Sequence, residues 1–289
     1  MQKGKIIKMG ERLMYKILKK EVMNQAVIMM EVEAPYVAAR CEAGQFVIVR
    51  LGEDGERIPL TIADFDREKN SVTIIFQIVG YSTEQFAKLE EGDGFDDFVG
   101  PLGQPAPFGK WNRVLGVAGG VGSAPLYPQL KKLSEMGVEC DVIIGGRSAE
   151  FVILAEKFAK FCKNVYIMTD DGSLGEQGLV TKKIQELLDA GEKYDHCIAI
   201  GPLVMMKFVV ATTKPADLHT TVSLNPIMID GTGMCGGCRV TVGGETKFAC
   251  VDGPDFDGFL VDFDECMKRQ TFFKEEEHAC RMKNAAANA

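Results

Sequence analysis

The chain has 289 residues, of which 46% are hydrophobic, and it carries a formal net charge of −8. This length suits two domains plus an appendage, and the even composition, without low-complexity tracts or evident repeats, is that of a compact globular protein. The acidic balance argues against a nucleic-acid or anionic-membrane surface, and no stretch approaches a membrane-spanning run.

Short strands are predicted along the N-terminal part of the chain. They are rich in Val and Ile and are separated by turn residues such as Pro35, Gly44 and Gly52. The expected strands are 15–22, 26–33, 45–50, 58–62 and 71–79. Several strands at this spacing predict a small antiparallel β-barrel, which we assign to residues 1–108.

A short helix is expected after the last of these strands. Ser82 and Gln85 have the spacing of a capping box, which predicts a helix that begins there and runs to Leu89. Free N–H groups and the helix dipole favour an anion at such a start, so it is a candidate phosphate site. An ordinary capped helix joining two elements is the alternative.

From residue 114 onward, strands and helices alternate. The expected strands are 114–118, 140–144, 165–169, 196–200 and 219–223, and the expected helices are 126–136, 154–162, 179–188 and 203–212. This order predicts a doubly wound parallel sheet, which we assign to an α/β domain at residues 109–224. Ligands of such sheets bind outside the carboxyl ends of the strands. The glycine-bearing loops expected at that edge are 119–125, 170–175 and 201–202.

The remaining segment, 225–289, contains a metal-ligand pattern. Asp230, Cys235, Cys238 and Cys250 follow the spacing D-x4-C-x2-C-x11-C. Plant-type [2Fe–2S] sites use C-x4-C-x2-C and a distant fourth cysteine. The intervening glycines permit sharp bends and let backbone N–H groups approach the sulfurs. A three-cysteine zinc site or plain buried thiols are the alternatives, although zinc ribbons usually pair two C-x2-C knuckles. We therefore expect a small [2Fe–2S] domain with one oxygen ligand.

The other cysteines are expected to be reduced. An odd total of nine, in a chain whose segment 1–10 has lysines but no apolar core of a signal peptide, does not indicate a disulfide framework. A cytoplasmic protein is therefore expected. Small core or surface positions are predicted for Cys41, Cys140, Cys162, Cys197, Cys266 and Cys280.

Taken in order, the motifs resemble those of the ferredoxin reductase superfamily. After the barrel come Gly-Pro-Leu-Gly at 100–103, Gly-Gly-Val-Gly-Ser-Ala-Pro at 119–125, Asp-Asp-Gly-Ser at 170–173 and Gly-Pro-Leu-Val-Met-Met at 201–206. The cluster motif narrows the resemblance to the branch that holds the dihydroorotate dehydrogenase electron-transfer subunit and the small subunit of NADH-dependent ferredoxin:NADP oxidoreductases (Nfn type). Asp230 favours the second, since that subunit uses one aspartate and three cysteines.

The resemblance implies FAD on the barrel. The segment along the isoalloxazine matches Pro59, Leu60 and Thr61, the next strand matches Ile75, Phe76 and Gln77, and the pair at the pyrophosphate matches Ser82 and Thr83. The usual arginine directly precedes the proline in this family, but here Ile58 fills that place and Arg57 is displaced by one residue. In a strand, such a shift turns the side chain to the other face. Whether Arg57 contacts the FAD is therefore left open.

The resemblance also implies nicotinamide binding at the sheet edge. The matching residues are Gly119, Gly120 and Gly122 at the phosphates, Asp170 and Asp171 at the ribose, and Gly201 and Pro202 near the nicotinamide. No arginine in the aspartate turn offers a ligand for a 2′-phosphate, which favours NAD(H) over NADP(H). Arg147, after the preceding strand, is the alternative phosphate ligand. A solvated acidic turn is the alternative for Asp171.

The implied activity is electron transfer between NAD(H), FAD and a [2Fe–2S] cluster. Because the cofactors carry this chemistry, no catalytic acid or base is assigned, and His196, His219 and His278 are expected to be structural or solvated. The resemblance implies a heterodimer with a larger subunit bearing flavin and [4Fe–4S] clusters, where ferredoxin and NADP(H) react by electron bifurcation. A dihydroorotate dehydrogenase subunit, a stand-alone NADH–acceptor reductase and a redox-sensing cluster protein are the alternatives.

Overall fold

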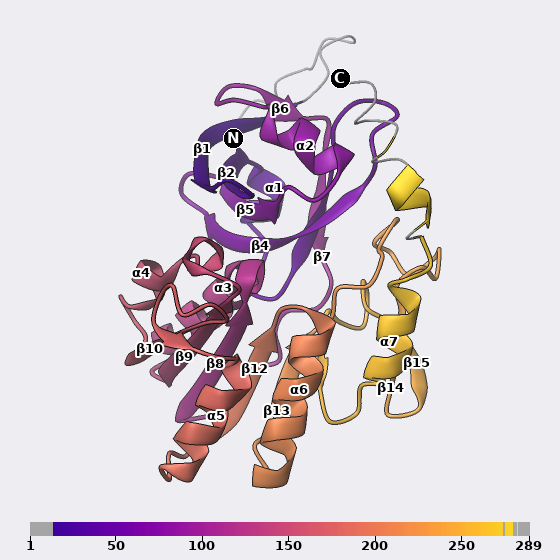
Figure 1. Cartoon of the computed structure of the whole chain (residues 1–289). Helices are drawn as coiled ribbons and strands as arrows, with labels where there is room; N and C mark the ends of the chain where they lie inside the picture. The colour runs from indigo at the N-terminus through magenta and orange to yellow at the C-terminus, as the bar shows by residue number, and fades with distance from the viewer. Residues whose placement is uncertain (1–13, 274, 280–281, 283–289) are drawn as a thin grey trace.

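The structure is a computed structural model that describes residues 14–273, 275–279 and 282. Segment 1–10 and Cys280, both considered above, lie outside the described residues. The chain forms a barrel, a sheet flanked by helices and a smaller C-terminal part that packs beside both of them (Figure 1). In the described residues, no helix is long and apolar enough to cross a membrane.

The barrel is a seven-stranded antiparallel sheet with the order β6-β1-β2-β5-β4-β3-β7. Its strands are β1 (Tyr15–Asn24), β2 (Val27–Glu33), β3 (Phe46–Arg50), β4 (Ile58–Asp66), β5 (Ser71–Gln77), β6 (Gly94–Phe95) and β7 (Asp97–Leu102). Side chains alternate along each strand. In β5, Val72, Ile74 and Phe76 pack into the barrel core, whereas Ile75 packs toward the neighbouring sheet. The two short helices are α1 (Pro35–Ala38) and α2 (Tyr81–Ala87).

Helix α2 is capped differently from the prediction. Gly80 is its N-cap, and the Thr83 hydroxyl accepts the N–H groups of Gly80 at 3.1 Å and Val79 at 3.0 Å. The hydroxyl of Ser82 instead donates to the carboxylate of Glu56. The predicted Ser82–Gln85 capping box is therefore wrong, because the N-cap is Gly80, two residues before Ser82, and Thr83 is the residue that reaches back to it.

The second sheet has the order β11-β10-β9-β8-β12-β13-β16. Its strands are β8 (Arg113–Gly119), β9 (Glu139–Gly146), β10 (Asn164–Thr169), β11 (Glu176–Gln177), β12 (His196–Ile200), β13 (Thr220–Ser223) and β16 (Asp255–Asp257). Every neighbouring pair is parallel except β13 and β16. The strand order reverses at β8, which places a ligand crevice at its carboxyl end.

Helices connect the parallel strands. They are α3 (Ser123–Glu135), α4 (Ala155–Phe158), α5 (Val180–Asp189) and α6 (Leu203–Thr213), with 3-10 turns η1 (Gly120–Gly122), η2 (Ala149–Phe151) and η3 (Lys214–Ala216). The predicted helix 154–162 shortens to α4. The first residue of the predicted helix, Leu154, has a φ of +63° and cannot join a right-handed helix, so α4 begins at Ala155.

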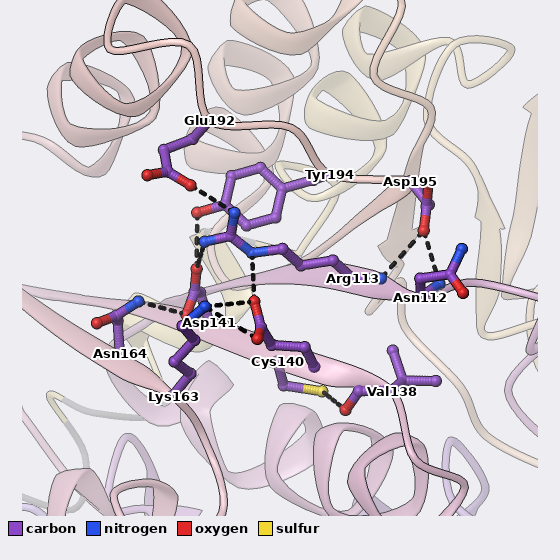
Figure 2. Close-up of polar contacts among 11 residues, drawn as sticks. Asn112, Arg113, Val138, Cys140, Asp141, Lys163, Asn164, Glu192, Tyr194 and Asp195 are labelled. Atoms are coloured by element: carbon purple, nitrogen blue, oxygen red, sulfur yellow. Dashed lines mark hydrogen bonds and ion pairs between the residues drawn. The ribbon is translucent and has the colours of Figure 1, made fainter.

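A polar cluster closes the amino end of the parallel sheet, opposite the ligand edge (Figure 2). Asp141 of β9 is 0% exposed and accepts hydrogen bonds from Arg113 at 2.6 Å, Tyr194 at 2.8 Å and Asn164 at 2.9 Å. Arg113 also pairs with Glu192. A buried carboxylate is tolerated when it is paired and hydrogen-bonded in this way. The cluster thus ties β8, β9, β10 and the approach to β12 together.

The C-terminal part contains a hairpin and a helix that the sequence did not predict. β14 (Arg239–Val242) and β15 (Glu245–Phe248) meet at Gly243 and Gly244, whose φ values of +61° and +80° suit a tight hairpin turn. Helix α7 (Phe263–Arg269) is capped by Asp262, whose carboxylate accepts the N–H of Glu265 at 2.9 Å. With a barrel, a doubly wound sheet and this small part, the predicted fold class is confirmed.

Candidate functional site

A cavity of about 980 Å³ lies where the barrel meets the carboxyl edge of the parallel sheet. This volume is near the top of the range of about 300 to 1,000 Å³ for ligand pockets. The barrel contributes β4 and β5, and the sheet contributes the loops that follow β8, β9 and β12. The cavity therefore joins the predicted flavin surface to the predicted nucleotide surface.

Most residues predicted to contact the flavin line the barrel side of this cavity. They are Pro59, Leu60, Thr61, Ile75, Phe76, Gln77 and Thr83. Antiparallel pairing places β4 beside β5, which brings these two segments to one wall. The predicted partner of Thr83, Ser82, is held by Glu56. Thr83 itself fixes the turn into α2, so its side chain shapes the cavity end rather than pointing freely into it.

The predicted nucleotide loops line the opposite side. Gly119, Gly120, Gly122, Gly201 and Pro202 all border the cavity. A Cβ on Gly122 would lie 2.2 Å from the carbonyl oxygen of Ile200, so the tight packing requires glycine. Gly120 has a φ of +55°, and a Cβ there would meet nothing within 4 Å. This open backbone allows the close approach that dinucleotide phosphates need.

The two aspartates of the following turn differ in their surroundings. Asp170 borders the cavity together with Arg147 of the loop after β9. The Asp171 carboxylate accepts the N–H of Ser173 at 2.9 Å and its hydroxyl at 2.6 Å, and these bonds lower the pKa of Asp171. The Ser173 oxygen accepts the N–H of Ala149 at 2.7 Å. Asp171 therefore caps its own turn, and Asp170 is the carboxylate available at the cavity.

Several lining residues were not predicted. The glycine pair at 145–146 ends β9, so the rule that ligands bind at carboxyl ends of strands already pointed to it. The apolar wall had no such signal, because its members come from separate elements and each reads as an ordinary core residue. These members include Phe46, Ile58, Phe151, Met168, Leu179, Met205, Phe208, Leu224 and Pro254.

The predicted cluster ligands lie around a glycine-rich turn, residues 230–238, which we call the cluster loop. Gly231, Gly233 and Gly236 have φ values of +76°, +81° and +68°, a conformation that glycine adopts readily. The sulfurs of Cys238 and Cys250 are 3.2 Å apart, which makes them neighbours although eleven residues separate them in the sequence. The loop thus brings the distant fourth position of the motif beside the third.

The remaining two donors lie at the outer side of the loop. Cys235 is exposed, and its sulfur accepts the N–H of Gly237 at 3.5 Å. The Asp230 carboxylate accepts the N–H groups of Thr232 at 2.9 Å and Cys235 at 2.7 Å, which lower the pKa of Asp230. It therefore stays ionised and lies next to a predicted ligand. The pKa of Cys250 is raised to about 12, mainly by burial and to a smaller extent by the neighbouring Cys238 thiol.

The donor set fits an iron–sulfur cluster. A [2Fe–2S] cluster spreads its ligands over two irons. A close sulfur pair plus two outer donors, with backbone N–H groups directed at sulfur, suits that demand.

Comparison with known proteins agrees with this geometry. Residues 225–262 match the family described as the iron–sulfur cluster binding domain of dihydroorotate dehydrogenase B. The chain is also 41% identical to a chain of the NADH-dependent reduced ferredoxin-NADP oxidoreductase studied for flavin-based electron bifurcation. The alignment covers 96% of this chain and 100% of that one, with a TM-score of 0.89.

Curated relatives agree as well. The dihydroorotate dehydrogenase B electron transfer subunit homolog of Thermotoga maritima is 44% identical over 269 residues, which cover 93% of this chain and 95% of that protein. The corresponding electron transfer subunit of Desulforamulus reducens is 33% identical over 243 residues, or 80% and 91% of the two chains. The predicted resemblance is thereby confirmed, and the chain belongs to the dihydroorotate dehydrogenase B electron transfer subunit family.

Proposed function

We propose that the chain is the NAD(H)-linked electron-transfer subunit of an electron-bifurcating, NADH-dependent ferredoxin:NADP oxidoreductase. The observation that carries this proposal is the likeness to a chain of such an enzyme over its whole length, at 41% identity. Asp230 supports it as well, because the family resemblance of the motif implies one aspartate and three cysteines in the Nfn-type subunit, and this chain has that set. The oxygen donor is harder than a thiolate and alters the properties of the iron it binds.

The cavity residues bind and orient the two organic cofactors. The β4 and β5 segments offer an apolar wall for the flavin of FAD, and the backbone of Gly119, Gly120 and Gly122 lies where NAD(H) phosphates would bind. When bound, the flavin exchanges a hydride with the nicotinamide and single electrons with a cluster. Asp170 is the ribose ligand in this arrangement, and NAD(H) is the preferred nucleotide because the aspartate turn has no arginine.

The cluster loop holds the metal centre. Asp230, Cys235, Cys238 and Cys250 would bind a [2Fe–2S] cluster, and metal binding would replace the proton of the buried Cys250 thiol. The neighbouring backbone N–H groups would tune its potential. The chain's own residues therefore provide position and electrostatics, and no side-chain acid or base is required.

The subunit acts in a heterodimer. A larger partner bearing flavin and [4Fe–4S] clusters would supply the sites where ferredoxin and NADP(H) react, since this chain has no further cluster motif. We place the complex in the cytoplasm, because all the cysteines in the described part of the chain are free thiols, as in a reducing compartment.

Purification of the native complex tests the proposal. We expect flavin, iron and acid-labile sulfide in this subunit. In the complex, we expect NADP to be reduced by NADH together with reduced ferredoxin, both of which are oxidised. A partner that carries FMN and oxidises dihydroorotate would instead establish the dihydroorotate dehydrogenase role, which the Desulforamulus reducens relative favours. Full activity without a partner would establish a stand-alone reductase, and stoichiometric zinc without sulfide would exclude the cluster.

A further inference from the structure

The barrel holds the cluster loop at its first ligand. Arg57, which directly precedes β4, donates from Nε to the carbonyl oxygen of Ile229 at 2.9 Å. Its terminal nitrogen lies 3.5 Å from the carbonyl oxygen of Asp230. The next residues of the chain, Ile58 and Pro59, line the flavin cavity. One short stretch of backbone therefore connects the cavity wall to the start of the cluster loop.

A second contact lies at the other end of the ligand set. The side-chain amide of Gln104 donates to the carbonyl oxygen of Val251 at 2.7 Å, and its backbone N–H donates to that of Gly253 at 2.6 Å. Val251 directly follows Cys250, the last predicted ligand. Gln104 comes two residues after β7, so both contacts originate from the barrel and they bracket the ligands from Asp230 to Cys250.

Close packing fills the space between these two contacts. A Cβ on Gly231 would lie 2.7 Å from Ile48 and 2.8 Å from Leu102, so the loop backbone rests directly on β3 and β7. Cys238 and Cys250 share one apolar core with Ile48. Figure 1 shows the C-terminal part beside β7 along this face. The loop is therefore fitted to the barrel and is held at both ends.

We propose that Arg57 and Gln104 are positioning residues that clamp the two ends of the cluster-ligand set onto the flavin barrel and so fix the separation of cluster and flavin. The inference rests on the proposed function for the identity of the two cofactors. It also assigns the displaced arginine of the flavin strand: its guanidinium binds the cluster loop, and Ile58 takes its place at the cavity.

Two consequences follow from the clamp. Electron transfer between two centres slows steeply as they move apart. A loosened loop lets the cluster move away from the flavin and therefore slows electron transfer between them. The guanidinium is a permanent positive charge beside the loop, and the reduced cluster carries one more negative charge than the oxidised one. Arg57 therefore favours the reduced form and raises the cluster potential, since net charge and hydrogen bonds around a cluster set that potential.

The test compares Arg57→Met, Gln104→Ala and the double variant with the wild-type holo subunit. Arg67→Met is the matched control, because Arg67 also donates to a backbone carbonyl of the barrel, that of Cys41, at 3.0 Å, away from the cluster loop. Three readouts are taken: hydrogen–deuterium exchange of amides 229–237, the cluster potential by titration followed with paramagnetic resonance, and the rate of electron transfer from reduced flavin to cluster.

We expect Arg57→Met to speed exchange of the loop amides, to lower the cluster potential and to slow electron transfer from reduced flavin to cluster relative to the Arg67→Met control. Arg57→Lys should restore the potential better than the exchange protection, because it keeps the charge without the forked geometry. Loss of the cluster with FAD retained, in Arg57→Met but not Arg67→Met, also supports the clamp.

The clamp proposal would be overturned if amide exchange of the loop, the cluster potential and the electron-transfer rate were all unchanged in the double variant. Failure of the proposed function is a separate result: wild-type protein would then lack flavin or cluster. Exchange of the loop amides in the cofactor-free chain would still show whether the two residues hold the loop.

Discussion

Asp230 combines an observed contact with a proposed role, which makes it the most informative single residue. Its carboxylate holds the loop by accepting the N–H groups of Thr232 and Cys235, and it stands at the first position of the proposed ligand motif. We expect Asp230→Ala to lose or destabilise the cluster. Asp230→Cys should keep a [2Fe–2S] centre with a changed potential and spectrum, because thiolate is a softer and stronger donor. Iron, sulfide and paramagnetic resonance measurements check both.

The control for this series is Asp257→Ala. Asp257 also caps a turn in the C-terminal half of the chain, accepting the N–H of Phe259 at 2.9 Å, but lies outside the ligand motif. It should keep a normal cluster, and FAD should remain bound in all three variants because the flavin wall is on the barrel. A normal cluster in Asp230→Ala would assign the fourth ligand to another group.

Asp255 gives the chain a pH-dependent stability. Burial raises the pKa of Asp255 to about 6, against the opposing effect of hydrogen bonds from Ser223 and Gln129. Because the folded state then binds the Asp255 proton more tightly than the unfolded state, the contribution of Asp255 to stability falls as pH rises from about 4 to about 6 and stays lower above that. His196, whose pKa burial lowers to about 4, contributes with the opposite sign in this range, so the effect of Asp255 is the difference between the wild-type and Asp255→Asn profiles. Asp255→Asn should remove this decline and stabilise the chain at pH 8 by up to about 3 kcal/mol.

Urea unfolding midpoints from pH 4 to pH 8 measure the effect. Asp217→Asn, an exposed change directly after η3, is the control and should follow the wild-type pH profile. Parallel profiles for wild type and Asp255→Asn would show that Asp255 is ionised in the folded state at every pH tested.

At the scale of residues, the sequence was most informative where chemistry is local. The ligand spacing from Asp230 to Cys250 lies largely within one loop, so it needed no knowledge of the tertiary fold. The direction of the Arg57 side chain did need it, because Arg57 turns to a loop that is more than a hundred residues away in sequence. The α2 cap is a different case: Thr83 contacts Gly80 only three residues away, so the local sequence held both this cap and the predicted one at Ser82.

At the scale of elements, the hydrophobic pattern of the sequence was sufficient to place the long buried strands. The buried strands β8, β9 and β12 read as continuous apolar runs between glycine turns, and their positions agree with the prediction. The elements that sequence reasoning missed are short or irregular. β7 contains Gly100 and Pro101, which interrupt the strand pattern, and β14 and β15 have four residues each. β7 pairs with β3, which is distant in sequence, whereas β14 and β15 pair with each other across Gly243 and Gly244, a local hairpin signal that sequence reasoning overlooked.

The polar cluster of Figure 2 yields a prediction at this scale. Removal of Asp141 leaves Arg113, Tyr194 and Asn164 facing an apolar hole at the amino end of the sheet. Breaking a buried pair on one side costs about 3 to 5 kcal/mol. Because Arg113 keeps its two glutamate partners, we expect Asp141→Ala to destabilise the sheet domain by about 3 kcal/mol, at the lower end of that range.

The measurement is the urea midpoint of the purified subunit. Glu245→Gln serves as the control, since it breaks the exposed ion pair with Lys247 on the hairpin and should leave the midpoint unchanged. Equal midpoints for Asp141→Ala and wild type would mean that water replaces the lost carboxylate at no cost. In that case the polar side-chain cluster around Asp141 would not stabilise the parallel sheet.

At the scale of the whole molecule, both functional regions lie between parts of the chain. The large cavity takes its walls from the barrel and from the parallel sheet, and the cluster loop lies on β3 and β7 of the barrel. Sequence reasoning placed each motif on its own element, and the rule for parallel sheets predicted which edge binds ligands. It did not predict which faces meet, because domain contacts such as Gly231 with Ile48 and Leu102 depend on shape complementarity.

This arrangement predicts that FAD couples the stability of the barrel to that of the sheet. A ligand that binds the folded state stabilises it by about 2.7 kcal/mol at 100 times its Kd. Trp111, the single tryptophan, stacks on His196 of β12 with ring centroids 4.1 Å apart, so its fluorescence reports on the sheet. Removal of FAD should therefore lower the thermal midpoint seen by Trp111, and added FAD should restore it in a concentration-dependent manner. A Trp111 midpoint that ignores FAD, while flavin release still marks melting of the barrel, would mean that the barrel alone binds the cofactor and that the sheet wall of the cavity contributes nothing to its affinity.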